Sequence, residues 1–190
     1  MGELYPGGPV TLPCRISIAG AVVDVRFVPA PTIAYYASTA QWGVLAQKLF
    51  DLPSVLRDRI ADLDDDFDDT DLTKAAIILT TRLSGCGDDI VAWRIMMHMS
   101  AAMVRDWLTI AGRITAMGID PSRDQLWRVI AATRHVITDG ASAEHRAYVE
   151  RALEYPLPIE PKCLPGAGSL TAVRRRASAE FDALAREIGG

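Results

Sequence analysis

The stretch that decides the fold is residues 88–117, DDIVAWRIMMHMSAAMVRDWLTIAGRITAM, which is followed by a glycine. It is long enough to span a bilayer, but polar and charged side chains interrupt it, most of them on one side at helical spacing. The interrupting residues are Arg94, His98, Arg105, Asp106 and Arg113. The pattern therefore predicts an amphipathic helix, or two helices bent near residues 100–102, and no membrane span.

Helical signals continue on both sides of this stretch. The spacing of apolar residues predicts further helices at 32–40, 41–50, 54–63, 71–84, 120–139 and 142–155. Asp120 is the expected N-cap of the helix that follows it, with Pro121 at the first helical position. Residues 12–28 instead alternate apolar and polar side chains around a central Ala-Gly turn, which predicts a β-hairpin.

The predicted fold is therefore mainly α, a bundle-like helical domain with a small N-terminal β-hairpin. The chain has 190 residues, which fits one domain and a short appendage. We expect residues 1–158 to form the hairpin and the helical domain. Residues 159–190 then form a Pro/Gly-rich linker and a short charged C-terminal helix at 171–188.

The overall charge argues against nucleic acid and against anionic lipid as partners. There are 24 acidic and 20 basic residues, so the chain carries no net positive charge that would attract phosphate. The predicted helices on either side of residues 138–141 have the outline of a helix-turn-helix. The second of them mixes glutamates with arginines, so it would repel phosphate as much as attract it. Three widely spaced cysteines suit a reducing compartment, and the N-terminus lacks the pattern of a secretory signal.

The patterns of catalytic and metal sites fail at required positions. Seven aspartates lie between Asp62 and Asp71, but an EF-hand loop there would need glycine in place of Phe67 and glutamate in place of Thr73. We interpret this run as a solvated acidic loop. No histidine pair has metal-ligand spacing, and no nucleophile elbow or phosphate-binding loop is present. The sequence predicts no catalytic activity, metal or cofactor.

Methionines and tryptophans are the remaining feature of the long stretch. They are Trp93, Met96, Met97, Met99, Met103, Trp107 and Met117. Core packing explains such residues, but methionine is also the adaptable residue of surfaces that bind partner helices. On the second interpretation, the candidate partner-binding residues are Trp93, Met97, Met103 and Trp107.

The order of elements also carries a family resemblance. Residues 118–121 (GIDP) lead into a segment that contains Trp127, and residues 147–158 (AYVERALEYPLP) end in a pair of prolines. Together with the hairpin and the aspartate-rich middle, this order over roughly residues 12–158 resembles the tail assembly chaperones of siphophages that infect actinobacteria. Members of that family often carry two or three adjacent tryptophans where this chain has only Trp93.

The resemblance implies a non-catalytic protein of the host cytoplasm, made during infection and absent from the mature virion. Its implied client is the tape measure protein, a long helical chain that must stay soluble while the tail tube protein assembles around it. Self-association is compatible with this role. Two alternatives stay open: a structural head-to-tail connector or other virion component, and a helical regulator that binds another protein.

Overall fold

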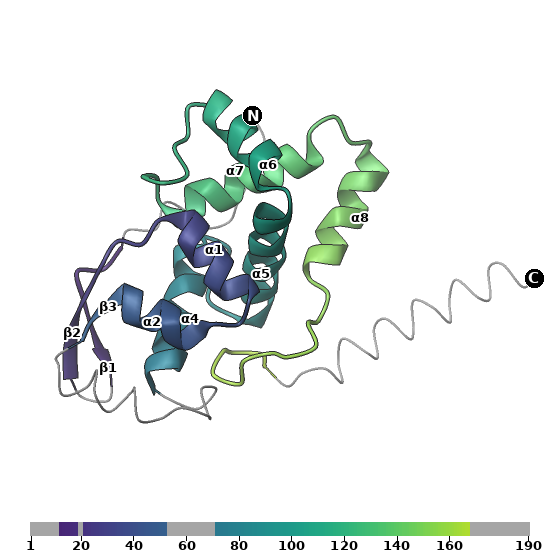
Figure 1. Cartoon of the computed structure of the whole chain (residues 1–190). Helices are drawn as coiled ribbons and strands as arrows, with labels where there is room; N and C mark the ends of the chain where they lie inside the picture. Colours follow the sequence, from purple (N-terminus) through teal and green to yellow (C-terminus); the bar gives the residue numbers. More distant parts are fainter. Residues whose placement is uncertain (1–11, 19–20, 53–70, 168–190) are drawn as a thin grey trace, which may run out of the picture.

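Figure 1 shows the computed structural model, which describes residues 12–18, 21–52 and 71–167. In these ranges there are seven helices and one three-stranded sheet. The helices are α1 (Ala30–Ser38), α2 (Trp42–Leu49), α4 (Asp71–Leu83), α5 (Ile90–Arg105), α6 (Trp107–Ala116), α7 (Leu126–Thr138) and α8 (Ala143–Leu153); the strands are β1 (Arg15–Ile18), β2 (Ala21–Val25) and β3 (Phe50–Asp51). The predicted mainly α fold with an N-terminal hairpin is confirmed.

The sheet consists of the predicted hairpin and one further strand. β1 and β2 are antiparallel, with Ile16 opposite Val23, and β3 adds to the other edge of β2, with Val25 opposite Phe50. Val23 and Phe50 are buried, so one face of this small sheet packs on the helices. The sequence did not predict β3, because two residues directly after a helix are too few to show an alternating pattern.

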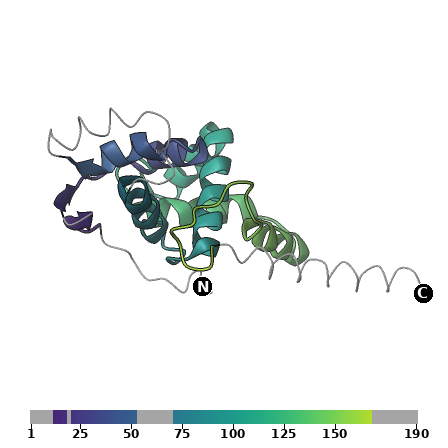
Figure 2. The same ribbon diagram turned by 90° about the horizontal axis from the view of Figure 1, so that it is seen from below.

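Helix α5 lies at the centre of the helical body. It contacts α1, α4, α6, α7 and α8, and its methionines Met96, Met99 and Met103 are fully buried. Figure 2 shows the sheet and α8 at opposite ends of this body. Within the described ranges, no helix has both the length and the apolar character needed to cross a bilayer. The core is therefore built around α5.

The long stretch divides into α5 and α6 at Asp106, and not near residues 100–102. Asp106 has φ −114° and ψ 35°, and it ends α5 one residue before α6 begins. Its carboxylate accepts a hydrogen bond of 2.9 Å from Arg105 Nε. Aspartate has a lower helix propensity than alanine, so a break at 106 is less costly than one at Ala101 or Ala102. The predicted position of the bend was therefore wrong.

Helix α7 begins at Leu126, later than the predicted start at Asp120. The Asp120 side chain accepts a 2.9 Å hydrogen bond from the Ser122 amide, and the Asp120 amide donates a 2.7 Å bond to the Asp124 carboxylate. These local bonds hold residues 120–124 in a turn. The start of α8 agrees with the prediction, because the side chain of Ser142 caps the helix.

The segment predicted as a linker packs against the helical body as far as the structure describes it. Leu164 is buried, and the amide of Ile90 donates a 3.0 Å hydrogen bond to the carbonyl of Pro165. The prediction of a linker is therefore wrong for residues 159–167. The prolines and glycines of this segment exclude a helix, but a segment without regular secondary structure can still pack against the helical body. The predicted helices at 54–63 and 171–188 and the acidic residues 62–70 lie outside the described residues.

Gly85, just after α4, lies close to Trp127 in the first turn of α7. Its φ is +74°, and a Cβ there would lie 2.8 Å from Trp127 Cβ. Gly140 has a φ of +72° but open space around it. We expect Gly140→Ala to lower the free energy of unfolding by about 1 kcal/mol, the cost of a left-handed alanine. Gly85→Ala should cost about 2–4 kcal/mol, because the clash adds to the same strain.

Urea denaturation followed by circular dichroism measures both losses. Equal losses for the two substitutions would contradict the close approach of Gly85 and Trp127.

Candidate partner-binding surface

One face of α5 carries side chains at heptad spacing, and the spacing continues into α6. The residues of this heptad row follow one another at intervals of four and three: Ile90, Arg94, Met97, Ala101, Val104 and Leu108. The first five of these positions lie in one line along α5. Leu108 follows the break at Asp106 and lies in the first turn of α6. The first two residues are buried, and the last three are exposed.

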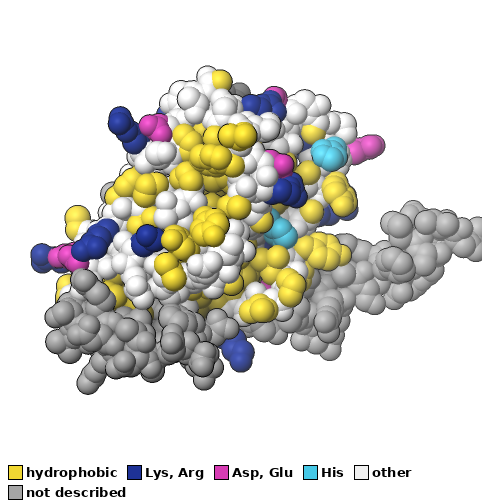
Figure 3. Space-filling model, in the orientation of Figure 1, with side chains coloured by type: hydrophobic (Ala, Val, Ile, Leu, Met, Phe, Trp, Pro, Cys, Tyr) yellow, Lys and Arg dark blue, Asp and Glu magenta, His cyan; other side chains and the backbone are white. Residues whose placement is uncertain are grey.

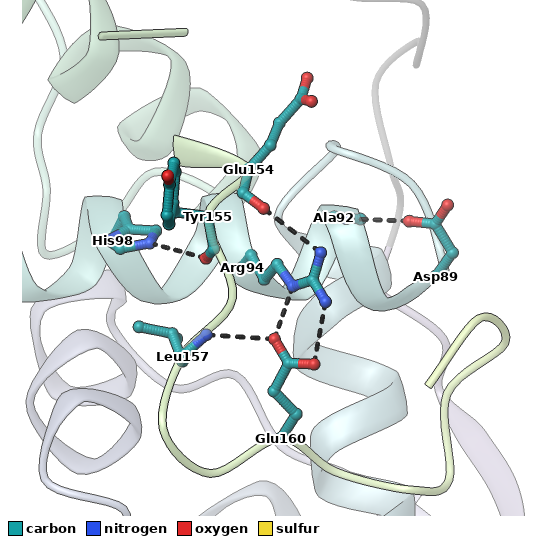
Figure 4. Close-up of polar contacts among 8 residues, drawn as sticks. All are labelled: Asp89, Ala92, Arg94, His98, Glu154, Tyr155, Leu157 and Glu160. Atoms are coloured by element: carbon teal, nitrogen blue, oxygen red, sulfur yellow. Dashed lines mark hydrogen bonds and ion pairs between the residues drawn. The ribbon is translucent and has the colours of Figure 1, made fainter. Parts of the chain in front are cut away.

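Residues 154–167 cover the first half of the heptad row, and a buried ion pair fixes them there (Figure 4). Arg94 Nε donates to Glu160 Oε1 at 2.6 Å, and Arg94 Nη2 donates to Glu160 Oε2 at 2.9 Å. The two side chains are only 3% and 9% exposed. Arg94 Nη1 also donates to the carbonyl of Glu154 at 3.3 Å. A charge buried to this degree needs its partner, so Arg94 ties the segment to α5.

Further polar contacts position the same segment. The amide of Leu157 donates to Glu160 Oε1 at 3.1 Å, and His98 Nε2 lies 3.4 Å from the carbonyl oxygen of Tyr155. Burial raises the pKa of Glu160, but the hydrogen bonds from Arg94 and Leu157 outweigh it, so this pKa lies below its ordinary value. Glu160 is therefore ionised at neutral pH and pairs with Arg94 as a carboxylate.

The remaining four positions of the heptad row are more open than Ile90 and Arg94. We call Met97, Ala101, Val104 and Leu108 the open row. Met97 is half-buried and Ala101 exposed, while Val104 is 38% and Leu108 87% exposed. Figure 3 shows hydrophobic side chains over the upper middle of this side of the molecule, where α1 and α6 lie. None of the described residues packs over Leu108. Exposed apolar side chains in a row are typical of an interaction surface.

The structure separates the four predicted partner-binding residues into two pairs. Trp93 is 3% exposed and Met103 fully buried, because both lie on the side of α5 that packs against the other helices. The prediction that Trp93 and Met103 contact a partner was therefore wrong, because neither side chain is accessible. Met97 belongs to the open row, and Trp107 lies beside Leu108, where it is half-buried and packs on the core. These two remain candidates.

Sequence reasoning missed three residues of the surface: Ala101, Val104 and Leu108. It weighted residue type, methionine and tryptophan, above position on the helix. The available signal was the four-three spacing that starts at Ile90 and continues past Asp106. That signal predicts a row, but not which half of it the chain itself covers.

Within the described ranges, no three His, Cys, Asp or Glu residues are arranged to hold a metal ion. Burial raises the pKa of the Cys86 and Cys163 thiols, which is the opposite of what activates a nucleophile. A small apolar cleft, open to solvent, is lined by Gln125 and otherwise by apolar side chains, Leu12, Phe27, Val28, Ile33, Leu49, Leu83 and Leu126.

Comparison with known proteins identifies no relative: no protein-family model, no curated protein and no solved structure matches the chain. The candidate surface is therefore defined by its own geometry. Its two parts are a covered half, fixed by Arg94 and Glu160, and the open row.

The buried ion pair between Arg94 and Glu160 leads to a prediction about stability. We expect Glu160→Gln to lower the free energy of unfolding at pH 7 by about 3 kcal/mol, because it leaves the buried Arg94 without its counter-charge. Glu150→Gln is the matched control: it removes a partner of Arg134, but the Glu150 side chain is 41% exposed. That change should cost less than about 1 kcal/mol.

The effect of Glu160→Gln should also depend on pH. The folded-state pKa of Glu160 lies below the ordinary value of 4.5. The contribution of its charge is therefore complete above the unfolded pKa and is lost as the pH falls through the lower, folded value. Urea denaturation between pH 7 and pH 3 should show the gap between wild type and Glu160→Gln narrowing below pH 4.5. A gap that stays constant to pH 3 would contradict an ionised, paired Glu160.

Proposed function

We propose that this chain is a phage tail assembly chaperone that binds the tape measure protein and keeps it soluble while the tail is built. The first support is the order of sequence elements over roughly residues 12–158. The observation that carries the proposal is the open row, in which apolar side chains at heptad spacing are exposed on a helical body. A long helical client with apolar stretches offers the complementary surface.

The composition of the open row suits a weak and adaptable contact. Burying a leucine or valine side chain contributes about 1.5–3 kcal/mol, so Val104 and Leu108 supply the main apolar gain on binding. Met97 can change its shape to fit different client side chains. A contact of this size releases readily, as a chaperone must do when the tail tube protein takes its place.

Binding in this proposal is passive. The chaperone holds exposed apolar client helices by mass action, and its effect depends on its concentration and affinity. Arg105 and Asp106 form an exposed ion pair at 2.9 Å beside the open row. Charged groups at the rim keep such a surface solvated while its apolar centre binds.

Substitutions in the open row test this function. Val104→Asp and Leu108→Asp each place a carboxylate where the client helix would pack. We expect each to weaken binding of the tape measure protein by about tenfold or more, the loss typical of a residue at the centre of an interface. The measurement is co-expression with the tape measure protein of the same phage, scored by the soluble yield of client and by co-purification.

Val44→Asp is the matched control, because Val44 is 40% exposed, close to the 38% of Val104, and lies on α2 away from α6 (Figure 1). It should leave client solubility unchanged. Thermal melting of all three variants should match the wild type, since none of the three side chains is buried. Equal client solubility with and without the wild-type chain would overturn the proposed function. Rings of the purified chain, or its presence in purified virions, would favour a head-to-tail connector instead.

A further inference from the structure

The outer face of α6 carries no charged residue, although α6 lies at the surface of the molecule. Helix α6 buries only Ile110 and Ile114, and its one charged residue, Arg113, lies at the edge of the exposed side. Five exposed, uncharged residues share about a third of the helix circumference. We call them the α6 face: Leu108, Thr109, Gly112, Thr115 and Ala116. The exposed positions of α8, in contrast, include Glu144, His145, Arg146 and Arg151. An uncharged exposed face of this kind is typical of a surface that another element covers.

The α6 face has a protruding side chain and a hollow one turn apart. Leu108 is 87% exposed, and nothing lies within 4 Å of the place that a Cβ of Gly112 would take. Glycine inside a helix is less favourable than alanine, and the packing of the single chain does not require it at position 112. The hollow therefore has a use only when something packs against it.

This shape is complementary to itself. When two copies of α6 run antiparallel, Leu108 of each copy lies over Gly112 of the other, so both hollows are filled. In a parallel pair the two leucines would meet each other and the hollows would stay empty. The antiparallel pair also opposes the two helix dipoles, which is the favourable arrangement.

We propose that the α6 face binds a second copy of this chain about a two-fold axis, with the two α6 helices antiparallel. The axis lies at the level of residue 110, midway between Leu108 and Gly112. A two-fold contact of this kind uses the same patch on both copies, as a self-complementary surface requires. The glycine lets the two helices approach closely.

The charges at one edge of the α6 face fit the same arrangement. Arg113 and Asp106 are seven positions apart, so they lie on the same edge of the helix. In the antiparallel pair, Arg113 of one copy lies beside Asp106 of the other, and the two-fold axis repeats this contact. The side chains are 47% and 51% exposed, so each has room for a further contact besides its ion pair with Asp139 or Arg105. This charge complementarity favours a second copy as the occupant.

The contact is small, with one helix from each copy, so the dimer belongs to the weak and reversible class. It does not depend on the proposed function, because it needs no client. If the proposed function is right, the dimer covers Leu108 and a client helix competes with the second copy for this side chain.

Sedimentation velocity of the purified full chain, without any client, tests the dimer between about 1 μM and about 1 mM. Gly112→Lys fills the hollow and places a charge at the centre of the contact. Ala147→Lys adds the same side chain at an exposed position of α8 and is the matched control. Thermal melting of Gly112→Lys shows whether the fold is intact. Its melting temperature should be at least that of the wild type, since lysine is a better helix former than glycine and the space at position 112 is open.

We expect the wild-type chain to dimerise reversibly and Gly112→Lys to raise the dissociation constant by about tenfold or more, the loss typical of the centre of an interface. Ala147→Lys should leave the dissociation constant unchanged. A wild-type chain that stays monomeric to about 1 mM, a dimer that Gly112→Lys does not weaken, or larger rings would each overturn the proposal. Because no client is present, these outcomes leave the proposed function standing.

Disulfide trapping tests the direction of the two helices. Chains carrying Leu108→Cys are mixed with chains carrying Gly112→Cys, oxidised, and digested for peptide mass spectrometry. The antiparallel pair predicts that links between positions 108 and 112 exceed links of either position to itself, because only the first two are close enough for a disulfide. A predominance of links of 108 to 108 or of 112 to 112 would contradict the antiparallel arrangement.

Discussion

The buried guanidinium of Arg94 is the constraint on which the path of residues 154–167 depends. It lies in α5, at the centre of the helical body, where an unpaired charge would cost several kcal/mol, a large part of the stability of a typical domain. Its carboxylate partner comes from residue 160, which is 66 positions away in the chain. The chain therefore has to return from α8 and lie along α5.

This return path determines which surface is available for binding. Residues 154–167 shield Ile90 and Arg94, while the later positions of the same heptad row stay exposed where the returning chain does not reach. Beyond the break at Asp106, Leu108 on α6 is the most exposed large apolar side chain of the described residues. One helix thus serves both as the centre of the core and as the base of the candidate surface.

Local signals in the sequence predicted the parts of the fold that local interactions determine. Alternation in residues 12–28 predicted the hairpin, and the spacing of apolar residues in 142–155 predicted α8. The pairing of Arg94 with Glu160 could not be predicted in this way, because its partners are distant and the proline-rich segment between α8 and residue 167 resembles a linker. Residue type alone also misplaced Trp93 and Met103, since methionines and tryptophans are common in cores and at interfaces alike.

Site-specific photo-crosslinking tests the central claim, that the open row is the binding surface, most directly. A photoreactive amino acid is placed at position 104 or 108 on the open row, or at position 44 on α2, in chains co-expressed with the tape measure protein. The account predicts crosslinks to the client from positions 104 and 108 and none from position 44. Crosslinks from position 44 alone, or equally from all three positions, would contradict it.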